Sequence, residues 1–186
     1  MTTPSTQDVA WITSPRQAWG RLDRDTPAEP GHLVAFDAGV LLDGYVGELG
    51  RTYAVRDAAM PDDGGVDPPA LRRRHAALRE RLLAACRPGA VTTDLLDAYE
   101  DAGEAPPPVP VARGLGMGFD LPLVTHALPE LASQQRLESG MVLALTAQVW
   151  EEGRGAVFEQ EPVLITDTGP ELLSADPIHE ARSEQT

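Results

Sequence analysis

The chain has 186 residues, of which 42% are hydrophobic and 24% are charged, and this is the size and composition of one globular domain. Its formal net charge of −14 argues against nucleic-acid binding, which needs a basic surface to neutralise phosphates. There is no run of 18 apolar residues and no signal peptide pattern at the N-terminus, so neither a membrane span nor export is predicted. Since the single cysteine, Cys86, cannot form an internal disulfide, the chain is predicted to be cytoplasmic.

Strand signals dominate the first third of the chain. The first 30 residues are polar and rich in proline around one apolar patch. Further along the chain, the pair Asp43-Gly44 is a strong signal for a tight turn. The predicted elements are strands at 9–12, 32–36 and 40–46, an end to the second strand at Asp37-Ala38-Gly39, and a loop at 57–69.

Two helices are predicted next. Residues 70–86 carry apolar side chains at three- and four-residue spacing, namely Leu71, His75, Leu78, Leu82 and Ala85. The arginines of this segment are predicted to form a solvated face, and they are Arg72, Arg73, Arg74, Arg79 and Arg81. A second helix is predicted to begin at a Thr92 or Thr93 cap and to run to about Ala102, where Gly103 closes it.

The last third returns to strands. Residues 140–150 and 157–166 are predicted to form two long strands joined by a hairpin turn at 152–155, and residues 175–186 a flexible tail. The order of strands, two helices and strands predicts an α+β fold with an antiparallel or mixed sheet.

Five segments between residues 29 and 174 resemble, in order, the second part of the pita-bread domain shared by methionine aminopeptidases, prolidases and creatinases. They are EPGHLVAFDAG, DGYVGELGRTYAV, ACRPGAVTTDLLDAYEDAG, RGLGMGFDLP, and LESGMVLALTAQVW with FEQEPVLITDTGPELLS. The resemblance implies a curved, mostly antiparallel sheet backed by helices. It also implies three parts: an N-terminal segment (1–30) with a short strand, the pita-bread-like domain (29–174) and the tail (175–186).

The resemblance implies a shortened domain, because family domains usually begin with helices that precede the strand expected at 9–12. Loss of these helices is expected to expose apolar sheet surface, which normally marks an interface. We therefore expect a homodimer or a partner protein to cover this face. The alternative is that residues 1–30 fold back over it.

The family holds two metal ions with two aspartates, one histidine and two glutamates. The corresponding positions here are Asp37, Glu48, Arg113, Thr146 and Gln160. A slip of one residue would replace Gln160 by Glu159 or Glu161, but it would also turn the side chain to the other face of the strand. We therefore assign Gln160 to the cleft.

This set of residues predicts no metal and no other cofactor. Arginine cannot serve as a ligand at neutral pH, and two divalent ions beside a guanidinium and only two carboxylates would be electrostatically unfavourable. We expect Arg113 to lie between Asp37 and Glu48 as a built-in cation. The alternative is that Arg113 points away and the carboxylates meet solvent.

Two histidines that assist catalysis in the family are also absent from their matching positions. One position falls near Trp19 or Gly20, and the other near Asp120. Of the four histidines in the chain, only His126 lies near the predicted site in sequence, and a lone histidine is more often structural than catalytic. The predicted cleft is lined by Trp19, Thr146, Gln160 and His126.

Three functions remain open. The first is a non-catalytic binding or assembly protein that uses the old peptide cleft for a small amino-acid-like or peptide ligand. The second is a metal-independent enzyme that acts on a small amino-acid-like or amide substrate through Asp37, Glu48, Asp120 and Arg113. The third, an active metalloaminopeptidase, is disfavoured because too few ligands remain.

Overall fold

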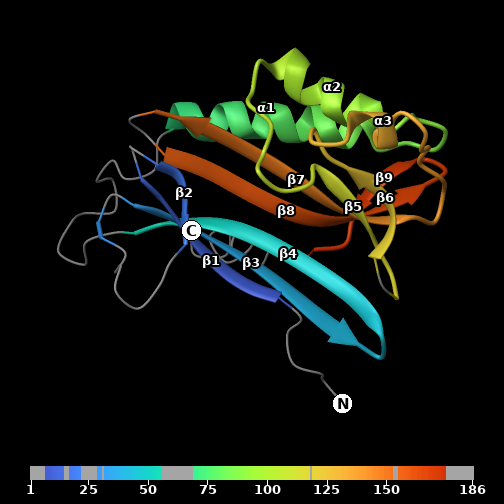
Figure 1. The fold of residues 1–186 in the computed structure, drawn as a ribbon, viewed down its shortest axis with the longest axis horizontal. Coiled ribbons are helices and arrows are strands. Elements are labelled where there is room, and N and C mark those ends of the chain that lie inside the picture. Colours follow the sequence, from blue (N-terminus) through green and yellow to red (C-terminus); the bar gives the residue numbers. More distant parts are fainter. Residues whose placement is uncertain are drawn as a thin grey trace, which may run out of the picture.

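The structure is a computed structural model, and it describes residues 7–14, 17–21, 29–30, 32–55, 69–117, 119–152 and 155–174. In this part of the chain, one nine-stranded sheet is backed by helices (Figure 1). The strand order is β2-β1-β3-β4-β8-β7-β5-β6, with β9 beside β8, and the paired strands are antiparallel. This arrangement confirms the predicted α+β fold.

The elements, in chain order, are β1 (Gln7–Ser14), β2 (Gln17–Arg21), β3 (Leu33–Leu42), β4 (Tyr45–Ala54), α1 (Pro69–Ala85), α2 (Thr93–Ala102), β5 (Ala112–Leu115), β6 (Phe119–Val124), α3 (Pro129–Ala132), β7 (Val142–Glu151), β8 (Gly155–Thr166) and β9 (Gly169–Leu172). Both long helices and the pair β7–β8 agree with the predicted segments to within two residues. The predicted loop at 57–69 lies outside the described residues except for Pro69, which begins α1, and so do residues 153–154 of the predicted turn and the whole tail.

The N-terminal segment contributes more to the sheet than the sequence predicted. It holds two strands, β1 and β2, and β1 pairs with β3 along Gln7–Thr13. The two strands thus extend the sheet beyond β3 at its edge.

Strand β3 does not end where the sequence predicted. It continues through Asp37, Ala38 and Gly39, which pair with β1 on one side and with β4 on the other. Because neighbours on both sides satisfy the backbone hydrogen bonds, the low strand propensity of these residues is overridden. The strand ends instead at the predicted turn, where Asp43 and Gly44 adopt φ angles of 50° and 88°.

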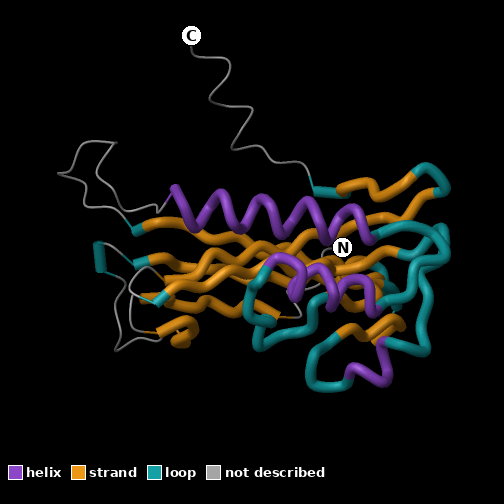
Figure 2. Tube along the Cα trace, turned by 90° about the horizontal axis from the view of Figure 1, so that it is seen from above, coloured by secondary structure: helices purple, strands orange, loops and turns teal. Residues whose placement is uncertain are grey.

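Helices α1 and α2 pack on one face of the sheet, over β7 and its neighbours, and Figure 2 shows them running lengthwise along the strands. We call this face the outer face and the opposite one the inner face. The largest buried side chains between the helices and the sheet include Leu71, Leu78, Leu82, Leu95 and Tyr99. The Tyr99 hydroxyl donates to the carbonyl of Thr146 at 3.1 Å and accepts from the amide of Gln148 at 3.0 Å, which fixes α2 on β7.

The sequence predicted that the arginines of α1 form a solvated face, but not all of them do. Arg73 and Arg81 are exposed, but Arg74 donates to Glu104 and Glu151. Arg79 donates to Glu159 of β8. The prediction was wrong for these two because their helix faces carboxylates of the sheet and of the connector after α2. It was also wrong for Arg72, which donates to the carbonyl of Thr52 at 3.2 Å. No helix in the described part of the chain is long and apolar enough to cross a membrane.

Candidate functional site

The strand register places three predicted site residues, Asp37, Gln160 and Thr146, in one row with Gly50 on the inner face. Asp37 of β3 pairs with Gly50 of β4, Gly50 pairs with Gln160 of β8, and Gln160 pairs with Thr146 of β7. Side chains at paired positions point to the same face of a sheet. The four positions therefore form one row across four neighbouring strands.

Two charged residues flank this row on the same face. Glu48 lies two residues before Gly50 on β4, and Arg113 of β5 pairs with Ala144, two residues before Thr146 on β7. Positions two residues apart share a face of a strand. Asp37, Glu48, Arg113, Thr146 and Gln160 are called the inner cluster below.

The approach of β4 to β8 depends on glycine. A Cβ atom added at Gly50 would lie 2.4 Å from the ring of Phe158 and 2.9 Å from the Cβ of Gln160. Any other residue would thus force β4 away from β8 at the one position where they pair.

A second contact brings the end of β5 against the start of β4. The amide of Val46 donates to the carbonyl of Gly116 at 2.8 Å, and the Tyr45 hydroxyl donates to the carbonyl of Leu115 at 3.2 Å. Although β4 and β5 are not neighbours in the sheet, its curvature brings them together here. Arg113 of β5 therefore lies within reach of Glu48.

Arg113 and Glu48 form an ion pair through Nη2 and Oε1. The Glu48 side chain is only 4% exposed and that of Arg113 is 20% exposed, so the pair is largely withdrawn from water. A buried carboxylate needs such a partner because its desolvation is costly. The structure thus contains the expected pairing of Arg113 with Glu48.

Asp37 also lies in the field of Arg113. Burial raises the pKa of the Asp37 carboxyl, and the positive charge of Arg113 opposes this increase. In turn, burial lowers the pKa of Arg113, while the negative charge of Asp37 raises it. Arg113 therefore binds one carboxylate directly and stabilises the other through space.

Two buried acceptors of the inner cluster have no partner among the residues that the structure describes. The amide nitrogen Nε2 of Gln160 donates to Oγ1 of Thr146 at 3.3 Å. Within the described residues, Oε1 of Gln160 and Oε2 of Glu48 have no hydrogen-bond partner. Both residues are 6% exposed. Buried polar atoms are normally paired, so these two oxygens are available to a hydrogen-bond donor.

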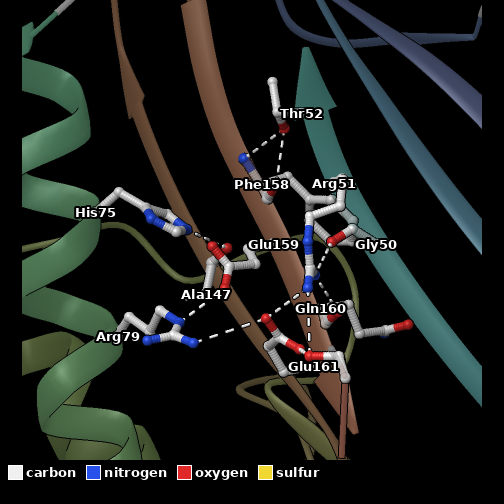
Figure 3. Close-up of polar contacts among 11 residues, drawn as sticks. Gly50, Arg51, Thr52, His75, Arg79, Ala147, Phe158, Glu159, Gln160 and Glu161 are labelled. Carbon is white, nitrogen blue, oxygen red and sulfur yellow. Dashed lines mark hydrogen bonds and ion pairs between the residues drawn. The ribbon is translucent and has the colours of Figure 1, made fainter. Parts of the chain in front are cut away.

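The neighbours of Gln160 on β8 point the other way (Figure 3). Glu159 accepts from Nε of Arg79 at 2.7 Å, and Glu161 accepts from Nη2 of Arg51 at 2.7 Å. Arg51, Arg79, Glu159 and Glu161 are called the outer cluster. Since both glutamates are engaged on the helix side, the register places Gln160, and neither glutamate, on the inner face.

The residues of the inner cluster do not fit a pair of divalent ions. Such ions need several carboxylate or imidazole ligands, and this cluster offers Asp37, one oxygen of Glu48, an amide and a hydroxyl. A guanidinium already occupies the other oxygen of Glu48. The described residues include no group of three or more histidine, cysteine, aspartate or glutamate side chains arranged to hold a metal.

The remaining predicted site residues are not all part of this cluster. His126 packs edge-on against Tyr99 of α2 with ring centroids 5.8 Å apart, and it lines a hollow of about 460 Å³ beside that helix. It therefore lies in the helix layer, contrary to its predicted place in the cleft, because the chain leaves β6 on the side of α2. Asp120 lies opposite Gly114, and Trp19 lies in β2, but the side chains of both are outside the description.

Gln148 is an inner-face residue that sequence reasoning missed. It follows Thr146 by two residues on β7 and is 5% exposed, and its Oε1 has no hydrogen-bond partner in the part of the chain that the structure describes. The two-residue period of a strand was the signal that would have found it.

Three comparisons relate this geometry to known proteins. Residues 7–167 match the model of metallopeptidase family M24. The chain is 29% identical over 153 residues to the putative dipeptidase YkvY of Bacillus subtilis, a match that covers 79% of this chain and 39% of that protein.

Solved structures show the same fold. A prolidase from Pyrococcus horikoshii superimposes with a TM-score of 0.70 at 19% identity, over 92% of this chain and 48% of that one. A methionine aminopeptidase from Thermotoga maritima gives a TM-score of 0.61 at 20% identity, over 91% of this chain and 74% of that one. The chain thus spans less than half the length of the dipeptidase and of the prolidase. The fold is the pita-bread fold, and the chain belongs to metallopeptidase family M24.

Proposed function

We propose that this protein binds a small ligand carrying a protonated amine at the inner cluster, and that it does so without two-metal chemistry. The observation that carries the proposal is a pair of buried acceptors that no described residue satisfies, Oε2 of Glu48 and Oε1 of Gln160. Acceptors of this kind match an ammonium group, which donates three hydrogen bonds and accepts none.

Charge supports the same class of ligand. With Asp37 and Glu48 ionised and Arg113 protonated, the inner cluster carries a formal charge of −1. An ammonium group would neutralise it, and a second anion would be repelled. Relatives of this chain include proteins named as a dipeptidase and a prolidase. An amino acid or short peptide with a free amino terminus is therefore the ligand class that we favour.

The Arg113–Glu48 ion pair supports a non-catalytic role. A guanidinium at this position cannot donate electron density to a metal, and it holds one of only two carboxylates in the cluster. In this proposal, the protein has a binding site on a peptidase fold and uses it for recognition.

Binding can be tested by titration calorimetry with free amino acids, amino-acid amides and X-Pro dipeptides, each beside its N-acetylated form. Binding of the free amines and not of the acetylated forms is expected. Glu48→Gln should weaken binding at least about tenfold, because it removes the charge that faces the ammonium. Glu159→Gln, which alters the opposite face of the sheet, should leave binding unchanged. Equal binding of acetylated ligands, or no binding of any amine, would contradict the proposal.

A second candidate function is a metal-independent enzyme that acts on a small amino-acid-like or amide substrate. The raised pKa of Asp37 favours it, because a carboxyl with a raised pKa serves more readily as a general acid or base. Turnover of these ligands in the presence of a chelator, lost in a folded Arg113→Ala variant, would support the enzyme. Two tightly bound divalent ions per purified chain would overturn both candidates.

A further inference from the structure

The outer face of the hairpin formed by β3 and β4 is apolar and exposed. Six large hydrophobic side chains on this face are between 39% and 55% exposed, and they are Phe36, Val40, Leu42, Tyr45, Leu49 and Tyr53. The register places them on one side of the hairpin, because they occupy alternate positions on each strand. This surface is called the hairpin face.

The hairpin face has almost no polar interruption. Its one charged position is Arg51, whose guanidinium is bound to Glu161 and to the carbonyls of Gly50 and Gln160. Phe36 and Tyr53 pack edge-on at 6.0 Å and form an aromatic end to the face. A face of this composition can be covered by another apolar surface without burying an unpaired charge.

The exposed area is large enough for an interface. With side-chain areas of the usual size, the six residues expose roughly 600 Å² per chain, which is at the upper limit for the largest patch on a monomer. Two such faces would bury about 1,200 Å² in total, which is the lower end of the range for stable interfaces.

The rest of the described surface has no larger group of exposed hydrophobic side chains. The apolar sides of α1 and α2 are already buried against the sheet. The other large hydrophobic residues that are exposed lie outside the hairpin face, and they are Met117, Leu121, Leu128, Leu172 and Leu173. In a homodimer, the hairpin face would therefore meet the same face of its partner, as two-fold symmetry requires.

The centre of the face also has a shape that fits its own copy. Leu49 pairs with Ala38 across the two strands, so a large side chain stands beside a small one. A two-fold axis through this point would bring Leu49 of one copy over Ala38 of the other. We propose that two copies of the chain dimerise through the hairpin face about such an axis, independently of what the inner cluster binds.

The oligomeric state tests this proposal directly. Sedimentation velocity of the full chain from about 1 to 100 μM should reveal a monomer–dimer equilibrium. Leu49→Asp should yield a monomer over this range, while Leu172→Asp should still dimerise. The two leucines are a matched pair, since they are 39% and 38% exposed and both lie in strands. Circular dichroism and thermal unfolding should show that both variants fold.

A cross-linking measurement keeps the proposal testable if Leu49→Asp fails to fold. The single native cysteine, Cys86, is fully buried, so an introduced surface cysteine is the reactive one. Ala38→Cys, close to the proposed axis but facing Leu49 of the other copy, should be joined to its counterpart by a thiol-reactive cross-linker that spans about 10 Å, and Leu172→Cys should not. A wild-type chain that stays monomeric at 100 μM, or a dimer that survives Leu49→Asp and fails to cross-link through Ala38→Cys, would overturn it. Capture of a different protein by an otherwise monomeric chain would overturn it as well.

Discussion

Strand β8 separates two clusters of polar side chains that differ in how completely their hydrogen bonds are satisfied. In the outer cluster, Arg51 donates to Glu161 and to two carbonyls, and Ser174 donates to the second oxygen of Glu161. In the inner cluster, the Arg113–Glu48 pair leaves one carboxylate oxygen of Glu48 without a partner in the described residues. The amide oxygen of Gln160 also has no partner there.

A structural cluster differs from a binding cluster in whether protein groups satisfy its buried acceptors. Burial raises the pKa of Glu161, as does its neighbour Glu159, while Ser174 and Arg51 lower it, so the outer carboxylate is surrounded by protein groups. Such a cluster holds α1, β4 and β8 together. The inner cluster is buried to a comparable degree, but two of its acceptors have no partner among the described residues. This pattern is expected of a site that binds a hydrogen-bond donor.

The largest expected effect concerns the outer cluster. Arg51→Met should lower the free energy of unfolding by about 3–5 kcal/mol, because it leaves the buried Glu161 with the Ser174 hydroxyl and, as its one ion pair, the longer contact to Arg79 at 3.7 Å. Urea unfolding measures the change. Arg73→Met, on the exposed side of α1, is the control and should change stability by less than about 0.5 kcal/mol. A similarly small change for Arg51→Met would mean that the outer cluster is not structural.

His75 makes the outer side of the sheet sensitive to acid. Burial, aided by the positive charges of Arg72, Arg79 and Arg51, lowers its pKa from 6.5 to about 4. The folded protein therefore holds neutral His75, and the unfolded chain binds the proton first as the pH falls. Stability should decline from pH 6.5 to about 4, with a contribution of about 3 kcal/mol from this group.

The variant His75→Gln isolates that contribution. Glutamine is neutral at every pH and can still donate to the carbonyl of Ala147, which His75 contacts at 3.3 Å. Urea unfolding of both proteins between pH 7 and pH 4 should give a steeper decline for the wild type. Parallel curves would show that His75 keeps an ordinary pKa.

On the inner face, Gly50→Ala should cost about 1–3 kcal/mol, because its new methyl group would meet the ring of Phe158 and the Cβ of Gln160. Gly47→Ala on the same strand is the matched control. Its nearest contact would be the side chain of Val40 at 3.3 Å, so the cost should be smaller. Equal unfolding midpoints for the two variants would mean that β4 moves away from β8 without penalty.

The smallest effect is expected at Asp37, where the substitution should raise stability, whereas the substitutions above lower it. Because burial raises the pKa of this carboxyl, its contribution to stability is full below about pH 3.8 and is lost as the pH rises through the folded value. Asp37→Asn imitates the protonated form and should raise stability near pH 7 by no more than about 1 kcal/mol. The gain should vanish in acid. A loss of stability at pH 7 would show that the attraction of Arg113 outweighs the cost of burial.

The sequence predicted the scaffold better than its edges. Periodicity located α1 and α2, and the Asp43-Gly44 signal marked the turn between β3 and β4, although the strand predicted at 40–46 ran across that turn. It missed β2, β5, β6 and β9, which are short or interrupted by glycine and proline. Their pairing partners, and not their own propensities, hold them in the sheet.

For the candidate site too, the sequence predicted some features and missed others. The identities at Asp37, Glu48, Arg113, Thr146 and Gln160 are properties of the sequence, and so is the shortage of metal ligands among them. The two-residue period of β8 also settled that Gln160 and its neighbouring glutamates face opposite sides. These features depend only on residue chemistry and local strand geometry, which the sequence determines by itself.

Which charged side chains contact each other depends on the tertiary structure. Arg113 reaches Glu48 because the sheet curves until β5 touches β4, and Arg51 reaches Glu161 because Gly50 lets β4 approach β8. His126, near in sequence, lies in the helix layer. Contacts between strands that are not sequence neighbours depend on sheet curvature and close packing, and these arise from the whole chain acting together.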